Sequence, residues 1–321
     1  MFRKYIITLL SAAALFSSNA RAVDAGKDWS DIDVTFVVWL SEDAEFFVPS
    51  IAGARDAAAD QGINLNIQFG DGNTATMNNI IEIAIANKVD ALAVSIWDDA
   101  AFDKIVCRAV NAGIRVLVHN IDDSAGDKGR ECALAYVGQD FVEAGYLIGK
   151  RMIADHGIGT GDTVFTPVEF PEAVYATKRR EGVQKAMEEV GASTEVLGAG
   201  VDQANTLNLM TQYLIGHPRT KAVIGLGVVP MSVVVKAARE AGVSVPVGGF
   251  DVSPPIIEGI TNGTITATMD QQPYSQGYIA VTQLSQWVKY GLYPASMATG
   301  GIGLLDADNV GIAAEWAGKT R

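Results

Sequence analysis

The sequence of 321 residues has few of the side chains that enzymes and metalloproteins use for chemistry. Its three histidines, His119, His156 and His217, are far apart, and none has another histidine or a cysteine at metal-ligand spacing. No segment matches a G-x-S-x-G elbow, a P-loop or an H-E-x-x-H motif. The usual sequence support for acyl transfer, nucleotide hydrolysis and zinc proteolysis is therefore missing. We expect no metal, no cofactor and no enzymatic activity.

Positive charge is also scarce. The chain has 24 lysines and arginines against 37 aspartates and glutamates, which gives a formal net charge of −13. Without Arg3, Lys4 and Arg21, 21 basic side chains face 37 acidic ones, and the net charge is about −16. Most of such a surface repels phosphate. We therefore expect no nucleic-acid partner.

Long apolar runs are absent except at the start of the chain. The run from Tyr5 to Phe16 follows Arg3 and Lys4 and precedes Ala20-Arg21-Ala22, which is the pattern of an export signal. The run is shorter than the roughly 20 residues of a membrane-spanning helix. We predict a signal peptide over residues 1–22, a mature chain from Val23, no lipid anchor and location in a periplasm.

Only two cysteines, Cys107 and Cys132, are present. In a reducing cytosol they would be buried thiols, whereas an oxidising compartment favours one disulfide between them. The two positions are predicted to lie in neighbouring elements of one lobe, where Cα atoms can approach within about 7 Å.

Short β-branched runs alternate with helical segments every 25 to 30 residues or so, which is the pattern of right-handed βαβ units and predicts a parallel sheet. In the first half, helices are expected from about Pro49, around Met77 to Ile85 and over Phe102–Ala112. The strands expected between them are Val34–Trp39, Ile63–Phe69, Ala91–Ile96 and Arg115–Asn120.

The same unit starts again near Gly138 and predicts a second parallel sheet. Its strands are expected at 163–168, 194–198, 222–227, 245–250 and 264–269, with helices at 141–154, 173–190, 205–215, 231–241 and 255–262. A last helix, about 275–290, has no strand partner in the second half and is expected to return to the first lobe. The fold class is thus α/β, with two doubly wound parallel-sheet lobes.

Residues suited to holding a sugar stand at the expected strand ends, where parallel sheets bind ligands. Aromatic faces cover the C–H faces of a sugar, and planar carboxylates and amides bind neighbouring hydroxyls in pairs. The alternative is that the acids cap helices and that Phe46 and Phe47 pack as a hydrophobic staple. The candidate residues at the strand ends are Trp39, Trp97, Asn120, Glu169, Asp202, Phe250 and Asp251.

Several blocks in this order resemble the type I periplasmic sugar-binding proteins close to the ribose-binding protein. The blocks are VTFVVWLSEDAEFFVPSIAGARDAAADQG from Val34, KRREGVQKA at 178–186, KAAREAG at 236–242, GFD at 249–251 and ATMDQQP at 267–273. The resemblance covers essentially the whole mature chain. It implies sugar contacts by Phe46, Phe47, Phe250 and Asp251, and a hinge role for Gln271.

The resemblance also implies three crossings between the lobes, near Gly138, Gln271 and Ala298. Each lobe is then discontinuous. The expected N-terminal lobe comprises residues 23–138 and 272–297, and the expected C-terminal lobe comprises residues 139–271 and 298–321.

The sequence departs from the ribose-binding pattern at the ligand. Asn120-Ile121 stands where ribose binders have Asp-Arg, a second arginine position falls near Thr177, and an asparagine position falls at Gly227. These departures argue against ribose and against ligands that need two arginines. Glu169, Tyr175, Asp202 and Trp39 are expected to rebuild the lining, and another aldose, a sugar alcohol or a furanose-like signal molecule remains open.

The expected function is a monomeric receptor that delivers a small carbohydrate to the membrane permease of an ABC importer. Three alternatives stay open. A regulator of the lactose-repressor type would carry a helix-turn-helix, an exported sugar enzyme would turn over substrate, and a signalling receptor would present its ligand to a chemoreceptor or sensor kinase.

Overall fold

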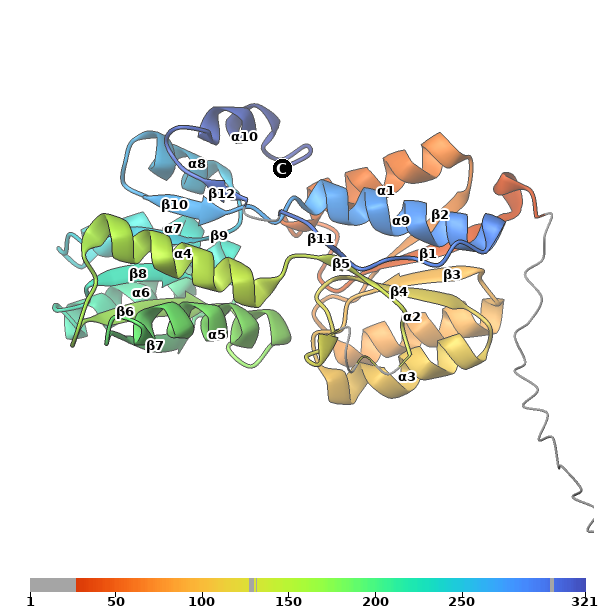
Figure 1. Ribbon diagram of the computed structural model, residues 1–321, viewed down its shortest axis with the longest axis horizontal. Coiled ribbons are helices and arrows are strands. Elements are labelled where there is room, and N and C mark those ends of the chain that lie inside the picture. Colours follow the sequence, from red (N-terminus) through yellow and green to blue (C-terminus); the bar gives the residue numbers. More distant parts are fainter. Residues whose placement is uncertain (1–26, 127–129, 131, 301–302) are drawn as a thin grey trace, which may run out of the picture.

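The computed structural model describes residues 27–321 except 127–129, 131 and 301–302, and the expected signal peptide at 1–22 lies outside the described residues. The chain forms two lobes side by side, each built on one six-stranded sheet with helices on both faces (Figure 1). The predicted α/β class with two doubly wound sheets is confirmed. Within the described part of the chain, no helix has the length and apolar character needed to cross a membrane.

The sheet of lobe 1 has the strand order β11-β5-β4-β3-β1-β2, and all its pairings are parallel. The central strands are buried over almost their whole length because helices cover both faces. Edge strand β2 alternates between exposed and half-buried residues over its first four positions. The strands are β1 (Asp33–Val38), β2 (Asn64–Phe69), β3 (Ala91–Val94), β4 (Arg115–Asn120), β5 (Tyr136–Gly138) and β11 (Met297–Ala298).

The sheet of lobe 2 repeats this arrangement with the order β12-β10-β9-β8-β6-β7. Its pairings are parallel except that β12 runs antiparallel to β10, a reversal that the repeating βαβ pattern did not predict. The strands are β6 (Thr163–Val168), β7 (Ser193–Gly198), β8 (Ala222–Gly225), β9 (Val247–Phe250), β10 (Ala267–Met269) and β12 (Leu304–Leu305).

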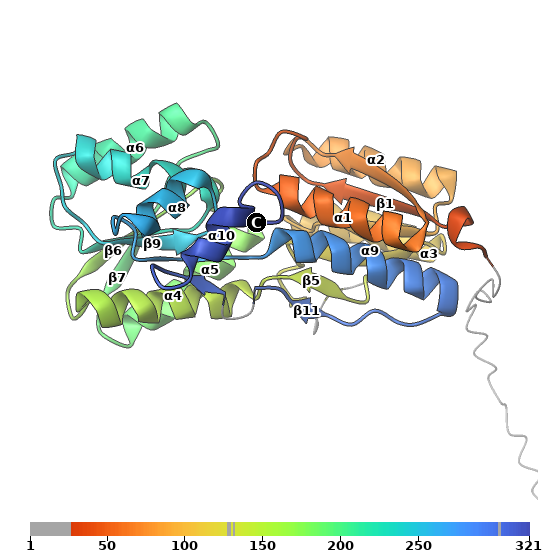
Figure 2. The same cartoon turned by 90° about the horizontal axis from the view of Figure 1, so that it is seen from above.

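In lobe 1, α1 and α9 cover one face of the sheet and α2 and α3 cover the other (Figures 1 and 2). The predicted return of the last long helix to the first lobe is therefore confirmed. Asn73 caps α2 by accepting a hydrogen bond from the Thr76 amide, and Gly62 ends α1 with a left-handed conformation. The helices are α1 (Phe47–Gln61), α2 (Thr74–Asn87), α3 (Asp99–Asn111) and α9 (Pro273–Tyr290), preceded by the 3₁₀ turn η1 (Trp29–Asp31).

In lobe 2, α4 and α5 pack together on one face, and α6 and α7 pack together on the other. Asp140 and Asp202 cap α4 and α6 by accepting hydrogen bonds from the amides of Glu143 and Asn205. The helices are α4 (Phe141–His156), α5 (Val174–Glu188), α6 (Gln203–Gly216), α7 (Val228–Glu240), α8 (Pro254–Thr261) and α10 (Val310–Trp316).

Glycines allow one very close helix pair in each lobe. A Cβ on Gly53 of α1 would lie 2.1 Å from the Tyr274 carbonyl oxygen, and one on Gly277 of α9 would lie 1.9 Å from that of Ser50. The pair α4 and α5 repeats the arrangement through Gly145 and Gly182, each facing a carbonyl oxygen of the other helix. Any larger residue at these positions would push the backbones apart.

The chain passes between the two sheets after β5, after β10 and between β11 and β12. Hydrogen bonds join these crossings. The Thr299 amide donates to the Gly138 carbonyl (2.7 Å), and the side chain of Gln276 donates to Gln271 O and Thr299 Oγ1. The crossings thus lie side by side and are short, with no long linker among the described residues.

Cys107 in α3 and Cys132 before β5 form a disulfide with a Cα–Cα distance of 5.1 Å. The predicted bridge is confirmed. It fastens the helix that precedes β4 to the segment that follows it, entirely within lobe 1.

Candidate functional site

A cavity of about 80 Å³ lies between the lobes, where the carboxyl ends of β1, β4, β6 and β9 converge. A cavity of this size suits one small molecule and not an oligomer. Its lining residues come from both lobes and from the second crossing: Trp39, Leu40, Phe46, Asn120, Ile121, Phe141, Glu169, Phe170, Tyr175, Arg179, Val201, Gly227, Val228, Val229, Asp251 and Gln271.

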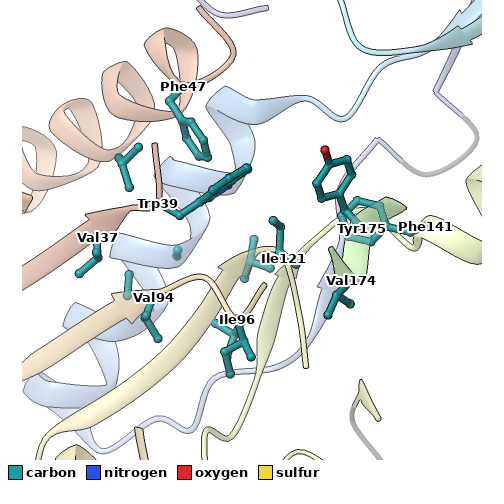
Figure 3. Packing of buried hydrophobic residues seen from close by; sticks show 14 of the residues in the cluster. Val37, Trp39, Phe47, Val94, Ile96, Ile121, Phe141, Val174 and Tyr175 are labelled. Carbon is teal, nitrogen blue, oxygen red and sulfur yellow. The ribbon is translucent and has the colours of Figure 1, made fainter. Parts of the chain in front are cut away.

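Trp39, immediately after β1, is the main side chain of the lobe 1 wall. Its ring stacks on Trp97 with centroids 5.7 Å apart and meets Phe47 edge-on at 6.2 Å. Across the cleft it approaches Tyr175 and Phe170 at 6.4 and 6.2 Å. Figure 3 shows Trp39 and Ile121 facing Tyr175 and Phe141 of the other lobe. The aromatic side chains of the two lobes therefore meet around the cavity.

Asn120 orients that tryptophan. Its Oδ1 accepts a hydrogen bond from Trp39 Nε1 (3.1 Å), and its Nδ2 donates to Gln276 Oε1 (3.1 Å). Its backbone is left-handed, with φ of 63°, a conformation that asparagine tolerates better than most residues. The hydroxyl of Tyr136 donates to the Asn120 carbonyl (2.8 Å) and holds this turn in place.

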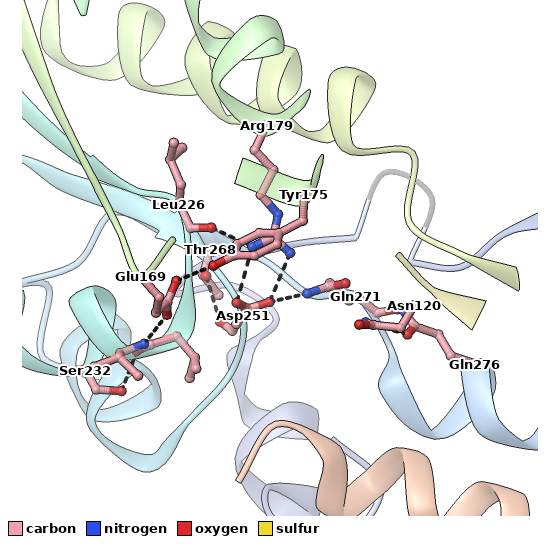
Figure 4. Close-up of polar contacts among 12 residues, drawn as sticks. Asn120, Glu169, Tyr175, Arg179, Leu226, Ser232, Asp251, Thr268, Gln271 and Gln276 are labelled. Carbon is pink, nitrogen blue, oxygen red and sulfur yellow. Dashed lines mark hydrogen bonds and ion pairs between the residues drawn. The ribbon is translucent and has the colours of Figure 1, made fainter. Parts of the chain in front are cut away.

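Asp251 is the corresponding residue of lobe 2, directly after β9 and also left-handed, with φ of 72°. Its Oδ1 accepts a hydrogen bond from Gln271 Nε2 (2.5 Å), and its two oxygens each lie 3.5 Å from a nitrogen of Arg179 (Figure 4). The carboxylate is almost fully buried, so the guanidinium supplies the opposite charge that a buried anion needs.

Arg179 on α5 was missed by the sequence reasoning, which placed the family's arginine near Thr177. Its side chain is 2% exposed, and Nη1 donates to the Leu226 carbonyl (2.5 Å). The guanidinium lies over the rings of Phe250, Phe141 and Tyr175, at 4.3, 5.0 and 5.3 Å. The signal was available: Arg179 stands four residues after Tyr175 and three before Gly182, on the buried face of an amphipathic helix.

Glu169, just after β6, places a second carboxylate on the wall of the cavity. Its Oε2 accepts from the Tyr175 hydroxyl (3.1 Å), and its Oε1 accepts from the Val229 amide in the first turn of α7 (2.9 Å). Burial raises the pKa of Glu169, and the hydrogen bond from Val229 opposes that shift. Gly227 makes room for this carboxylate, because a Cβ there would lie 2.0 Å from Glu169 Oε2.

Seven of the eleven residues expected at the site line the cavity: Trp39, Phe46, Asn120, Glu169, Tyr175, Asp251 and Gln271. The other four lie elsewhere. Phe47 and Phe250 are fully buried, behind Trp39 and beneath Arg179 respectively, and Trp97 stands behind Trp39. Asp202 is exposed and caps α6, the alternative role that the sequence left open for such acids.

Phe141 and Phe170 are additional lining residues, one at the start of α4 and one after β6. The described residues contain no group of three or more histidine, cysteine or acidic side chains arranged to hold a metal ion. The chemistry of the cavity is therefore that of aromatic faces, one arginine, two carboxylates and two amides.

Two lobes of the same α/β topology, with a small cavity between them where their strand ends meet, define a ligand-binding protein. The chain belongs to the periplasmic binding protein family: residues 34–291 match the family described as periplasmic binding protein domain. Members of this family are binding proteins and not enzymes, and this holds for the chain.

The sequence is similar to the xylose/arabinose-binding protein XylF of Sulfolobus acidocaldarius, with 29% identity over 273 residues. The match covers 79% of this chain and 66% of XylF, so the chain spans just under two thirds of that relative. It is 27% identical to a carbohydrate transporter of Acidothermus cellulolyticus 11B in complex with myo-inositol, with a TM-score of 0.80 over 89% of this chain and 98% of that one.

A third similar protein is a solute-binding protein of an ABC transporter from Burkholderia graminis C4D1M, in complex with D-arabinose. Its identity is 25% and its TM-score is 0.79, over 89% of this chain and 98% of that one.

Proposed function

We propose that the protein captures one small carbohydrate, an aldose or a cyclic polyol, between its two lobes. The observation that carries the proposal is the cavity between the lobes, with an aromatic wall on lobe 1 opposite a cluster of buried charges on lobe 2. Aromatic faces suit the C–H groups of a sugar ring, and carboxylates, guanidinium and amide suit its hydroxyls. The similar proteins bind xylose or arabinose, D-arabinose and myo-inositol, which are ligands of this class and size.

Two buried polar atoms on the cavity wall support this role. Among the described residues, Gln271 Oε1 and Arg179 Nε have no hydrogen-bond partner within the protein. An acceptor and a donor buried in this way are unfavourable unless something pairs with them. A sugar hydroxyl both donates and accepts, so one ligand can satisfy an acceptor and a donor together.

The proposal includes transport. The receptor would act as a monomer in the periplasm, where its acidic surface and its disulfide fit an exported protein, and would deliver the sugar to the permease of an ABC importer. The three crossings would serve as hinges, because a few residues between the lobes can absorb the change in dihedral angles while the lobes stay rigid.

A thermal-shift screen of aldoses and polyols followed by calorimetry tests the proposal. A ligand at about a hundred times its Kd should stabilise the protein by about 2.7 kcal/mol. Asp251→Asn should weaken binding about tenfold or more, because it removes the charge that Arg179 and Gln271 hold in place. The matched control is Asp202→Asn, an aspartate outside the cavity, which should bind normally. A panel without a single ligand, or normal binding by Asp251→Asn, would contradict the proposal.

A further inference from the structure

Apolar side chains line both sides of the cavity, but the polar side chains are unevenly divided between the two sides. Lobe 1 contributes Trp39, Leu40, Phe46, Asn120 and Ile121. Among these side chains, Asn120 has an amide group, Trp39 has an indole N–H, and the other three have no polar atom. Both polar atoms of Asn120 already have partners inside lobe 1, and the indole N–H of Trp39 is one of those partners. Each polar side-chain atom of the lobe 1 wall is therefore engaged within that lobe.

Lobe 2 and the second crossing hold the groups that can bind hydroxyls. Glu169, Arg179, Asp251 and Gln271 line that side together with the hydroxyl of Tyr175. The buried atoms without a protein partner on the cavity wall, Gln271 Oε1 and Arg179 Nε, belong to this same side. Figure 4 shows this cluster gathered around Asp251.

From this asymmetry we infer that the ligand is a deoxy sugar, bound with its hydroxyl-bearing edge toward lobe 2 and an edge without hydroxyls toward lobe 1. The inference rests on the proposed carbohydrate-binding function and narrows it to one class of sugar. A methyl or methylene group fits against Trp39, Leu40, Phe46 and Ile121. A hydroxyl in its place would lose its hydrogen bonds to water, and no side chain of the lobe 1 wall has a free donor or acceptor to replace them.

The size of the expected preference follows from the chemistry of the wall. Apolar pockets discriminate against an added hydroxyl by at most about a hundredfold, since the intruding group is desolvated but still fits. The deoxy member of a matched pair should therefore bind about ten to a hundred times more tightly than its fully hydroxylated counterpart.

Calorimetry with matched pairs is the test: L-rhamnose with L-mannose, L-fucose with L-galactose, and 2-deoxy-D-ribose with D-ribose. D-xylose, D-arabinose and myo-inositol complete the panel as fully hydroxylated ligands. The inference is supported if the tightest ligand of the panel is a deoxy sugar and binds about ten to a hundred times more tightly than its counterpart. If the tightest ligand of the panel is fully hydroxylated, the inference is wrong and the proposed function stands. If none of these compounds binds, the proposed function itself fails.

Variants of Leu40 test whether the preference for a deoxy sugar comes from the lobe 1 wall of the cavity. Leu40 is half-buried in the loop after β1, so a polar side chain of similar length can be accommodated there. Leu40→Gln adds a hydrogen-bond donor and an acceptor, which favour the hydroxylated sugar. The affinity for the deoxy sugar divided by that for its hydroxylated counterpart should therefore fall about tenfold. Leu40→Met keeps the wall apolar and should leave the ratio unchanged. Equal ratios in Leu40→Gln and the unaltered protein would overturn the assignment of the apolar edge to lobe 1.

Discussion

The carboxylate of Glu169 occupies the space that any side chain at position 227 would need. A Cβ on Gly227 would lie 2.0 Å from one carboxylate oxygen and 2.5 Å from the other. The space at position 227, where the resemblance to the ribose-binding protein implied an asparagine position, is thus filled by a carboxylate from a different strand end. A glycine and a glutamate 58 positions apart in the sequence form one functional unit.

Gly227→Ala should therefore weaken sugar binding. The backbone of Gly227 is extended, with φ of −162°, so alanine can adopt it, and the displaced group is the end of a flexible side chain. Moving Glu169 breaks its hydrogen bonds to Tyr175 and Val229, and we expect about tenfold weaker binding by calorimetry. In a Glu169→Ala background the same change should have almost no effect, and additive losses would contradict the coupling.

The titration of Glu169 should make the folded protein less stable as pH rises. Burial raises the pKa of Glu169 above its ordinary value of 4.5, so between these two pKa values the folded state binds more protons than the unfolded state. Stability is then lost as pH rises through that interval. Denaturant unfolding of Glu169→Gln should show a gain over the unaltered protein at pH 7 that shrinks toward pH 4.

The control for this pH dependence is Glu189, on the surface of lobe 2. Hydrogen bonds from Lys150 and Tyr146 lower the pKa of Glu189, so its charged form stabilises the folded state. Glu189→Gln should therefore be less stable than the unaltered protein at pH 7, by a difference that shrinks as pH falls. The same pH dependence in both variants would argue against burial as the cause.

Substitutions of the two neighbouring phenylalanines at the start of α1 should affect different properties, one the stability of the fold and the other sugar binding. Phe47 is fully buried against Trp39 and Phe46, and Phe47→Ala should cost about 3–5 kcal/mol of unfolding free energy. Phe46 is only partly buried and lines the cavity, so Phe46→Ala should mainly weaken sugar binding. Urea unfolding and calorimetry on both variants check this, and a larger stability loss for Phe46→Ala would contradict it.

His119 should make lobe 1 sensitive to acid. Burial lowers its pKa to about 4, although the hydrogen bond that its ring donates to the Val37 carbonyl (2.9 Å) favours the charged form. The unfolded state then takes up a proton first, and stability falls as pH drops from about 6.5 toward 4, by about 3 kcal/mol at the lower limit. His119→Gln retains a donor for Val37 and should lose this part of the pH dependence. An unchanged slope would assign the acid sensitivity to other groups.

The Cys107–Cys132 bridge should stabilise the protein by limiting the unfolded chain. For a loop closed over 25 residues the entropy model gives about 3 to 3.5 kcal/mol. The double variant Cys107→Ser/Cys132→Ser should lose about that much unfolding free energy, measured with urea. The unaltered protein under reducing conditions should behave like the double variant, and a loss below about 1 kcal/mol in both would contradict the prediction.

The fold was largely predictable because its elements leave local signals. The strands at Thr163–Val168 and Arg115–Asn120 match their predicted bounds, since an apolar β-branched run between turn residues has few other structures open to it. Strand β12 was not predicted, because two residues at a sheet edge carry no periodicity and take their direction from tertiary pairing.

The site was predictable only in part, for a physical reason that Phe46 and Phe47 illustrate. Adjacent residues at a helix start point in directions about 100° apart, and the packing of the helix decides which of them enters the core. Position at a strand end was a better guide for Asp251 and Glu169, because the backbone itself carries those side chains to the cleft. For Arg179, the spacing from Tyr175 and Gly182 indicated a buried helix face, but the sequence did not show its role, because its partner Asp251 lies 72 positions away.

The close glycine-mediated helix pairs of the two lobes imply an order of folding. In lobe 2 the pair is α4 with α5, and both helices are present once residue 188 has been made. In lobe 1 the pair is α1 with α9, which is not finished until residue 290. A chain that emerges from its N-terminus therefore begins lobe 1 first, but completes the close helix pair of lobe 1 only after that of lobe 2. Until α9 is made, the face of α1 that packs against α9 is exposed and is open to chaperones and to aggregation.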